Sequence, residues 1–386
     1  MTSAPPAAPE AAEDPTGTLR PLATRVVGSY CVPNWLGGLK TDRHRGRISP
    51  GYLEGIHDEM IKAAVKDQEL VGLDIVSDGE LRRDNEVDYL LEQIPGVEIV
   101  SRPKTYYQDY LEAVLVAPLP EGDEAGCTKL VDDFAFVSRL TDRPVTISIP
   151  GPFSLSRRLT DQAYEDQGAL VLALGRYLHG VAAGLAAAGA HFLQIDEPFL
   201  AGYPEVASLA VQAINLVTEG VDVHWAAHIC YGNRYARPVW EGHYDFLFPA
   251  VLDSQVDQLV LEFARKGYDD LALFRRFPSK LQVGVGVIDV KTNTVESEDV
   301  VARRIYQALA VLPPDRLMVN PDCGLRHLPP SVARAKLDSM TRAADRVRAD
   351  VLGVAFEESG KGPSTTEPGS RTSDPDVQNT YPSEGS

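Results

Sequence analysis

The sequence predicts a (β/α)8 TIM barrel that carries an insertion after its second strand. Short runs of β-branched and apolar residues recur along the chain, and segments with helical spacing follow most of them. Eight such runs can be found, which favours a closed barrel over an open sheet. The predicted strands are residues 25–29, 73–77, 144–149, 191–195, 223–228, 258–262, 282–287 and 316–320.

Helices are predicted where apolar residues recur every three or four positions. They cover residues 52–71, 170–188, 300–312 and 330–348. The segment 81–142, after the second strand, does not fit the repeat of strand and helix. We therefore predict that it is an insertion on the barrel, partly loop and partly hairpin.

The two ends of the chain differ in composition from the rest. Residues 1–18 and 358–386 have few apolar side chains and many Pro, Ser, Gly and acidic residues. Such segments cannot bury enough apolar surface to offset the entropy of ordering, so we predict that both are disordered. Residues 19–357 are then a single catalytic domain, which is a size that one barrel with insertions commonly has.

Composition favours a small-molecule partner. A formal net charge of -18 would repel nucleic acid and anionic membrane surfaces.

The N-terminus lacks the basic and apolar regions of a secretion leader, and the Ala-rich run 181–190 is short and broken by Gly, so no membrane span is expected. The four cysteines are widely spaced, which predicts reduced thiols and a cytoplasmic protein. Two of them, Cys31 and Cys127, are interpreted as ordinary free thiols.

Polar side chains gather where the predicted strands end. In a (β/α)8 barrel the loops after the strands converge on one face, and catalytic residues lie there. The candidate side chains are Ser29, Asp78, Glu80, Asp196, Glu197, His228, Cys230, Glu262, Asp289, Lys291, Asp322 and Cys323.

Four of these residues have the chemistry of metal ligands. His228 and Cys230 are two positions apart in an extended segment, so both can point to the same side. The pair alone is equally well explained as a buried His and a buried thiol. Glu262 and Cys323, at the ends of later strands, complete a set of one nitrogen, one oxygen and two sulfur atoms, which zinc prefers.

The chain resembles the catalytic barrel of the cobalamin-independent methionine synthases, over about residues 26–349. The most specific motif is NPDCGL, which contains Cys323. In that family the His and Cys of HxC, a Glu and the NPDCGL Cys hold zinc, so the resemblance implies that His228, Cys230, Glu262 and Cys323 do so here. The matching segments are GLDIVSDGELRRDNEVDYL (72–90), QIDEPFL (194–200), HIC (228–230), GVGVIDVKTNTVES (284–297) and VLPPDRLMVNPDCGL (311–325).

The same resemblance implies a pocket for the amino acid part of homocysteine, formed by Gly28, Ser29, Glu80 and Asp196. Backbone N–H groups and a hydroxyl suit a carboxylate, and two carboxylates suit an ammonium group. Strand-end capping and ion pairing with neighbouring arginines are the alternative roles for the two acidic residues.

Two positions depart from the family pattern. Lys291 stands where the methionine synthases have a His that assists protonation of the folate leaving nitrogen, so Lys291 is the candidate proton donor. The Trp that packs on folate after the third strand is missing from residues 150–158, and the second, N-terminal barrel of the long enzymes is missing too. The thiol side of the site is therefore better matched than the folate side.

The leading prediction is a zinc-dependent transferase that moves a methyl group from a 5-methyltetrahydrofolate-type donor onto homocysteine, forming methionine. The alternative resembles the epoxyalkane:coenzyme M transferases of the same wider group, in which a thiolate opens an epoxide. Two carboxylates would repel the sulfonate of coenzyme M, which favours homocysteine. A third reading is a non-catalytic or corrinoid-partnered barrel. The oligomeric state is not predicted.

Overall fold

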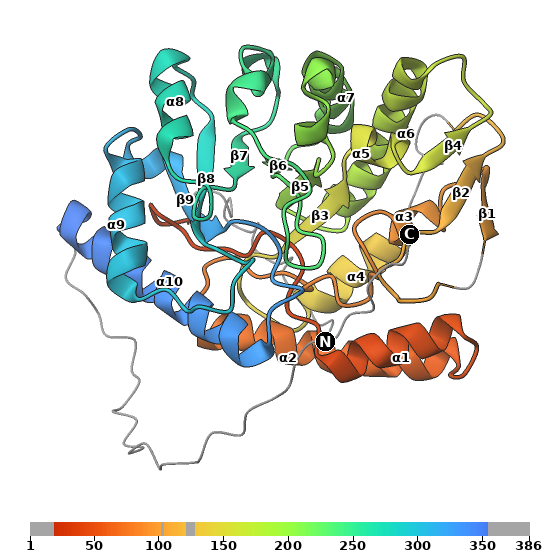
Figure 1. The fold of residues 1–386 in the computed structure, drawn as a ribbon, viewed down its shortest axis with the longest axis horizontal. Coiled ribbons are helices and arrows are strands. Elements are labelled where there is room, and N and C mark those ends of the chain that lie inside the picture. The colour runs from red at the N-terminus through yellow and green to blue at the C-terminus, as the bar shows by residue number, and fades with distance from the viewer. Residues whose placement is uncertain (1–18, 102–103, 121–127, 354–386) are drawn as a thin grey trace, which may run out of the picture.

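Six parallel strands form the main sheet of the protein, in the order β3-β5-β6-β7-β8-β9 (Figure 1). The computed structural model describes residues 19–101, 104–120 and 128–353. Both predicted disordered ends and Cys127 lie outside these residues, so the domain boundaries stay predictions. The strands are β3 Thr146–Pro150, β5 Phe192–Asp196, β6 His224–Ile229, β7 Gln258–Leu261, β8 Gln282–Ile288 and β9 Leu317–Pro321.

The first two predicted strands close this sheet into a barrel. They are present as isolated parallel bridges rather than as longer strands, because each turns into a polar loop after a few residues. Pairing therefore passes from β9 through both segments to the start of β3, and the predicted (β/α)8 barrel is confirmed. The bridges join Thr24 to Val319, Arg25 to Ile75, and Val76 to Val145.

Helices surround the strands on the outside of the barrel (Figure 1). All four predicted helices are confirmed, with ends that move by a few residues. They are α2 Pro50–Leu70, α6 Gln167–Ala187, α9 Glu298–Leu309 and α10 Pro330–Leu352. The further helices are α1 Asn34–His44, α3 Asp88–Leu91, α4 Thr128–Ser138, α5 Pro152–Ser156, α7 Ala207–Thr218 and α8 Ala272–Arg276.

Helix α6 corrects one expectation. It has 21 residues and is apolar enough to cross a membrane by length and composition, whereas no such stretch was expected from the sequence. Most of this helix is buried, and it packs against α5 and α7. We therefore interpret it as a core helix of the barrel.

The insertion after the second strand contains the expected hairpin and also two helices, the short α3 and the longer α4. β1 Val97–Ser101 and β2 Glu112–Leu115 pair antiparallel, and β4 Leu159–Asp161 extends them as a parallel neighbour of β2. The prediction of loop and hairpin was wrong for α4, which ends the insertion and packs against α2 and α6. Its buried side chains recur at helical spacing: Leu130, Phe134 and Val137.

The barrel interior below the site is polar. Arg25 is 1% exposed, and its guanidinium donates hydrogen bonds to the side chains of Gln194, Thr146 (3.3 Å) and Gln258 (3.3 Å). Burial lowers the pKa of Arg25 to about 10, although Asp196 opposes the shift. This layer cross-links four segments inside the barrel.

Gly286 in β8 allows close contact between neighbouring strands. A Cβ atom here would lie 3.0 Å from both the Asp322 Cα and the Leu261 carbonyl oxygen. Backbone atoms cannot move aside cheaply, so we expect Gly286→Ala to reduce the free energy of unfolding by about 2–3 kcal/mol, measured by urea denaturation. Gly55→Ala, in α2 where no described atom lies within 4 Å, is the control and should be neutral or stabilising. Equal denaturation midpoints for Gly286→Ala and wild type would contradict this prediction.

Candidate metal centre and substrate pocket

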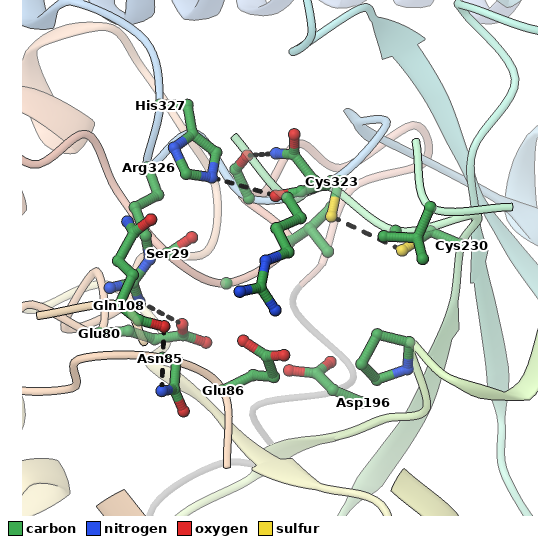
Figure 2. A pocket seen from close by; sticks show the side chains of 18 of the residues that line it. Ser29, Glu80, Asn85, Glu86, Gln108, Asp196, Cys230, Cys323, Arg326 and His327 are labelled. Carbon is green, nitrogen blue, oxygen red and sulfur yellow. Dashed lines mark hydrogen bonds and ion pairs between the residues drawn. The ribbon is translucent and has the colours of Figure 1, made fainter. Parts of the chain in front are cut away.

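A cavity of about 240 Å³ opens at the carboxyl ends of the strands. Polar side chains from several loops point into it (Figure 2). Of the predicted metal ligands, substrate residues and proton donor, Glu262 and Lys291 are not among the described residues that line it, whereas all the others are. Those lining residues are Gly28, Ser29, Glu80, Asp196, His228, Cys230 and Cys323.

Three predicted metal ligands converge. The ligand atoms of His228, Cys230 and Cys323 all lie within 4.8 Å of one another. The Cys323 sulfur is 3.7 Å from the Cys230 sulfur and 3.7 Å from Nε2 of His228. The first two residues come from the end of β6, and the third follows β9, so only barrel closure brings them together.

The protonation of this group suits a metal ion. Nδ1 of His228 lies 3.0 Å from the Val260 carbonyl oxygen and must be the donor, which leaves Nε2 free to coordinate. The hydrogen bond with Cys323 raises the pKa of Cys230, and burial adds to this shift. Hydrogen bonding to Cys230 and the nearby His228 ring hold the pKa of Cys323 well below its ordinary value, although burial opposes this shift. The donor set therefore fits zinc.

The fourth predicted ligand, Glu262, is paired with cations. Its carboxylate is fully buried and accepts hydrogen bonds from Nε of Arg265 at 2.7 Å and Nζ of Lys291 at 3.0 Å. Burial would lower the pKa of Lys291, but Glu262 and the two cysteines outweigh it and raise the pKa. Lys291 is therefore a charged ammonium group that Glu262 binds, and it lies outside the described cavity lining.

The predicted thiol-substrate residues lie beside this group. Gly28 lets Glu80 approach, since a Cβ atom on Gly28 would lie 2.7 Å from the Glu80 carboxylate. Ser29 packs against Gly324, the residue after Cys323. Glu80 has φ of 54°, a left-handed conformation that is uncommon for residues other than glycine and is often found at functional sites.

Asp196 ends β5, where strand pairing places it next to His228 on β6. The side chain of Gln194 donates a hydrogen bond to Oδ1 of Asp196 at 2.7 Å. Burial raises the pKa of Asp196 to about 7, although the neighbouring His228 opposes the shift. Asp196 and Glu80 therefore bring two carboxyl groups into the cavity close to the cysteines.

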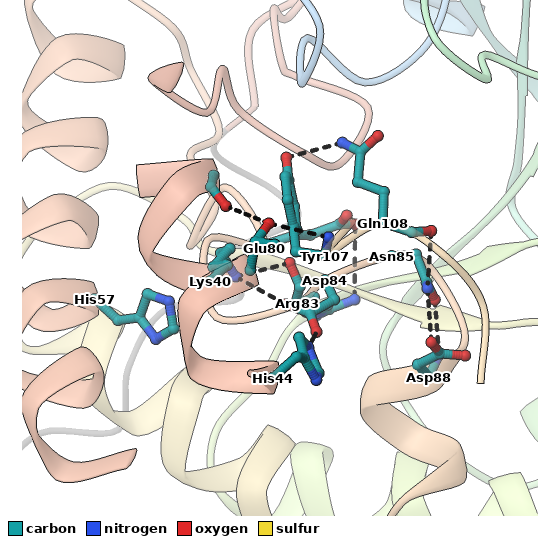
Figure 3. Close-up of polar contacts among 12 residues, drawn as sticks. Lys40, His44, His57, Glu80, Arg83, Asp84, Asn85, Asp88, Tyr107 and Gln108 are labelled. Carbon is teal, nitrogen blue, oxygen red and sulfur yellow. Dashed lines mark hydrogen bonds and ion pairs between the residues drawn. The ribbon is translucent and has the colours of Figure 1, made fainter. Parts of the chain in front are cut away.

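A buried ionic network holds the loop after Glu80 in place (Figure 3). The carboxylate of Asp84 contacts His44, Lys40 (3.5 Å) and Lys104 (3.2 Å). Burial alone would raise the pKa of Asp84, but these neighbours lower it well below its usual range. Arg326 donates to the backbone carbonyl of Asp84 at 2.9 Å. The loop is fixed from several sides, so its side chains are presented rigidly to the cavity.

Several cavity residues were not identified from the sequence. They come from the insertion and from loops after β3, β5, β6 and β9, whose residues have no fixed spacing from the barrel strands. The resemblance covered the positions 85 and 86 within its first motif, but it gave no role to either. The unassigned side chains include Asn85, Glu86, Gln108, Tyr110, Arg158, Phe199, Trp240 and Arg326.

The family model for the catalytic domain of cobalamin-independent synthases matches residues 22–346. The methionine synthase of Saccharolobus solfataricus is 31% identical over 332 residues, which cover 86% of this chain and 96% of that protein. The chain belongs to the cobalamin-independent methionine synthase family. The methionine synthase of Sulfurisphaera tokodaii, which is 28% identical, matches over 97% of its own length.

A solved structure agrees with this assignment to the cobalamin-independent methionine synthase family. The B12-independent methionine synthase from Shewanella sp. W3-18-1, in complex with selenomethionine, has a TM-score of 0.74 and 26% identity. The match covers 87% of this chain and all of that chain. A methyltransferase from Methanosarcina mazei, with a TM-score of 0.57 and 13% identity, shares the fold alone. The predicted family is confirmed, and the chain is a transferase of this family.

Proposed function

We propose that the protein transfers a methyl group onto the thiol of homocysteine and forms methionine, with a 5-methyltetrahydrofolate-type donor. The observation that carries this proposal is one cavity in which a zinc-type ligand group and two carboxyl groups lie side by side. The complex of the Shewanella relative with selenomethionine, the selenium analogue of methionine, supports it.

Zinc is the proposed cofactor, held by His228, Cys230 and Cys323. When bound, it would lower the pKa of a substrate thiol so that the thiol ionises at neutral pH. For Glu262 we propose the fourth ligand position, with its carboxylate oriented by Arg265 and Lys291. Lys291 then serves to hold the Glu262 carboxylate in place.

The amino acid part of homocysteine is proposed to bind between the first strand and β5. The carboxyl groups of Glu80 and Asp196 accept hydrogen bonds from its ammonium group, and the Gly28–Ser29 turn receives its carboxylate. Coenzyme M has a sulfonate and no ammonium group, so these two acidic side chains disfavour it. The epoxyalkane reaction is therefore not favoured.

Aromatic side chains form the wall on the donor side. The rings of Phe199 and Trp240 meet edge to face with centroids 5.7 Å apart, and Tyr110 lies 6.5 Å from Phe199. Trp240 comes from the loop after β6, so the cavity has an indole although the segment after β3 lacks one. A planar ring such as a pterin fits such a surface.

The proposed partners are small molecules only, and the proposed location is the cytoplasm. The net charge of -18 and the reduced state proposed for Cys31, Cys230 and Cys323 support both.

The direct test supplies zinc-loaded protein with homocysteine and 5-methyltetrahydrofolate, and follows thiol loss and product mass. A parallel reaction contains coenzyme M and a short epoxyalkane. We expect methionine in the first reaction and no thioether in the second. A hydroxyalkyl thioether without methionine would reverse the assignment of the electrophile.

A further inference from the structure

Methyl transfer from nitrogen to sulfur requires an acid near the donor. As the C–N bond breaks, its electron pair stays on nitrogen, and a proton from a positioned group lowers the barrier. The expected acid, Lys291, is bound to Glu262 at 3.0 Å, and its side chain is only 4% exposed. It is not among the described residues that line the cavity, so the proton must come from another group.

We propose that the carboxyl group of Glu86 is this acid. The proposal rests on the proposed function, because it assumes a donor whose leaving atom is an amine nitrogen. Glu86 lines the cavity, and Figure 2 shows its side chain pointing inward. It belongs to the loop that Asp84 and Arg326 anchor, so its position is set by the buried network.

The other carboxyl groups of the cavity are engaged elsewhere. Glu80 accepts hydrogen bonds from Ser148 at 2.7 Å and Arg326 at 3.3 Å, which keep it as an acceptor. Asp84 is held ionised by lysines. Asp196 lies next to His228, on the side of the thiol.

The nitrogen bases of the cavity are equally unsuited. Nε2 of His327 lies 3.1 Å from the carbonyl oxygen of Asn233 and must donate to it, and burial lowers the pKa of this His to about 4. Its ring is therefore neutral, and its other nitrogen can only accept. Arg158, Arg234 and Arg326 do not release protons in this pH range.

The surroundings of Glu86 suit an acid. Tyr110 donates a hydrogen bond to Oε1 of Glu86. Burial raises the pKa of Glu86, the charge of Asp88 adds to this, and Tyr110 and Arg326 oppose it. Arg158 and Arg234 lie over the Tyr110 ring, 4.0 and 5.0 Å from its centroid. The carboxylate left after proton transfer keeps the Tyr110 hydrogen bond.

The proposed step balances. The acceptor thiol first releases its proton to water. The sulfur electron pair then forms the S–C bond while the C–N bond breaks, and the nitrogen takes the proton of Glu86. Glu86 recovers a proton from water after the product leaves. In total, one methyl group moves from nitrogen to sulfur and one proton moves from sulfur to nitrogen.

The test compares two methyl donors, 5-methyltetrahydrofolate and methyl iodide, with homocysteine as acceptor. Iodide leaves without a proton, so only the folate reaction needs the acid. We expect Glu86→Gln to lower kcat with the folate by about 10²- to 10⁴-fold and to leave the methyl iodide rate, above the uncatalysed background, within about threefold. Glu112→Gln removes an exposed carboxylate from β2 and should match wild type with both donors.

The pH profile provides a second readout. A rate that needs protonated Glu86 falls as the pH rises above the pKa of that group. In wild type, this decrease of the rate at high pH should occur with the folate and not with methyl iodide. Tyr110→Phe removes a hydrogen bond that stabilises the carboxylate, so it should move this fall to higher pH.

Three results would overturn the proposal. If Glu86→Gln lost activity equally with both donors, Glu86 would have a structural role. If Glu86→Gln kept its activity with the folate, Glu86 would have no role in catalysis. If wild type used methyl iodide but not the folate, the assumption that the leaving atom is an amine nitrogen would be wrong. If wild type formed methionine with neither donor, the proposed function itself would be refuted.

Discussion

Replacing Cys323 by Ser is expected to remove zinc from the protein and to lower methionine formation by at least about 10³-fold. The Cys323 sulfur lies 3.7 Å from both Cys230 Sγ and His228 Nε2, at the centre of the ligand group. A serine hydroxyl remains protonated at neutral pH and is a poor zinc ligand, so the site would lose an anionic ligand. Bound zinc is measured by elemental analysis, beside the turnover of homocysteine.

Cys31→Ser is the matched control for Cys323→Ser. Cys31 is also a free cysteine, 3% exposed, but it lies outside the described cavity lining. We expect this variant to keep its zinc and at least half of its activity. Circular dichroism should show the same helix content for both variants, since the ligand group lies at the rim of the barrel. Full zinc occupancy and activity in Cys323→Ser would refute the proposed metal centre.

Asp196→Asn is expected to raise the KM for homocysteine by about 100-fold. Loss of a buried charged hydrogen bond typically costs 2–5 kcal/mol, and about 2.7 kcal/mol corresponds to a factor of 100. The asparagine keeps the size of the side chain and loses the charge that would face the ammonium group. Initial rates at varied homocysteine concentrations, with saturating methyl donor, give the KM.

A thiol without the amino group separates substrate binding from general damage. With 4-mercaptobutanoate, which lacks only that group, Asp196→Asn and wild type should react at similar rates. Asp222→Asn, at an exposed position before β6, should behave as wild type with both thiols. If Asp196→Asn slows the two thiols equally, Asp196 supports the fold or the metal centre rather than the ammonium group.

Local sequence patterns were sufficient for most of the barrel. The spacing of apolar residues predicted α2, α6, α9 and α10, because each buries one face against the strands. The same spacing did not lead us to predict α4, although the buried residues of α4 repeat as in a helix. This helix lies within a long insertion, where no neighbouring strand indicated that a barrel helix should follow.

The sequence by itself determined the family, the barrel and the identity of the cysteines and the histidine in the ligand group, because short motifs at strand ends carry this information. Only the tertiary structure decided that Glu262 pairs with Lys291 and Arg265, and that Glu86 faces the cavity. Glu86 meets Tyr110 from the insertion, 24 residues away in sequence. Such pairings depend on how loops of unequal length fold over the barrel rim, and no periodicity in the sequence specifies that geometry.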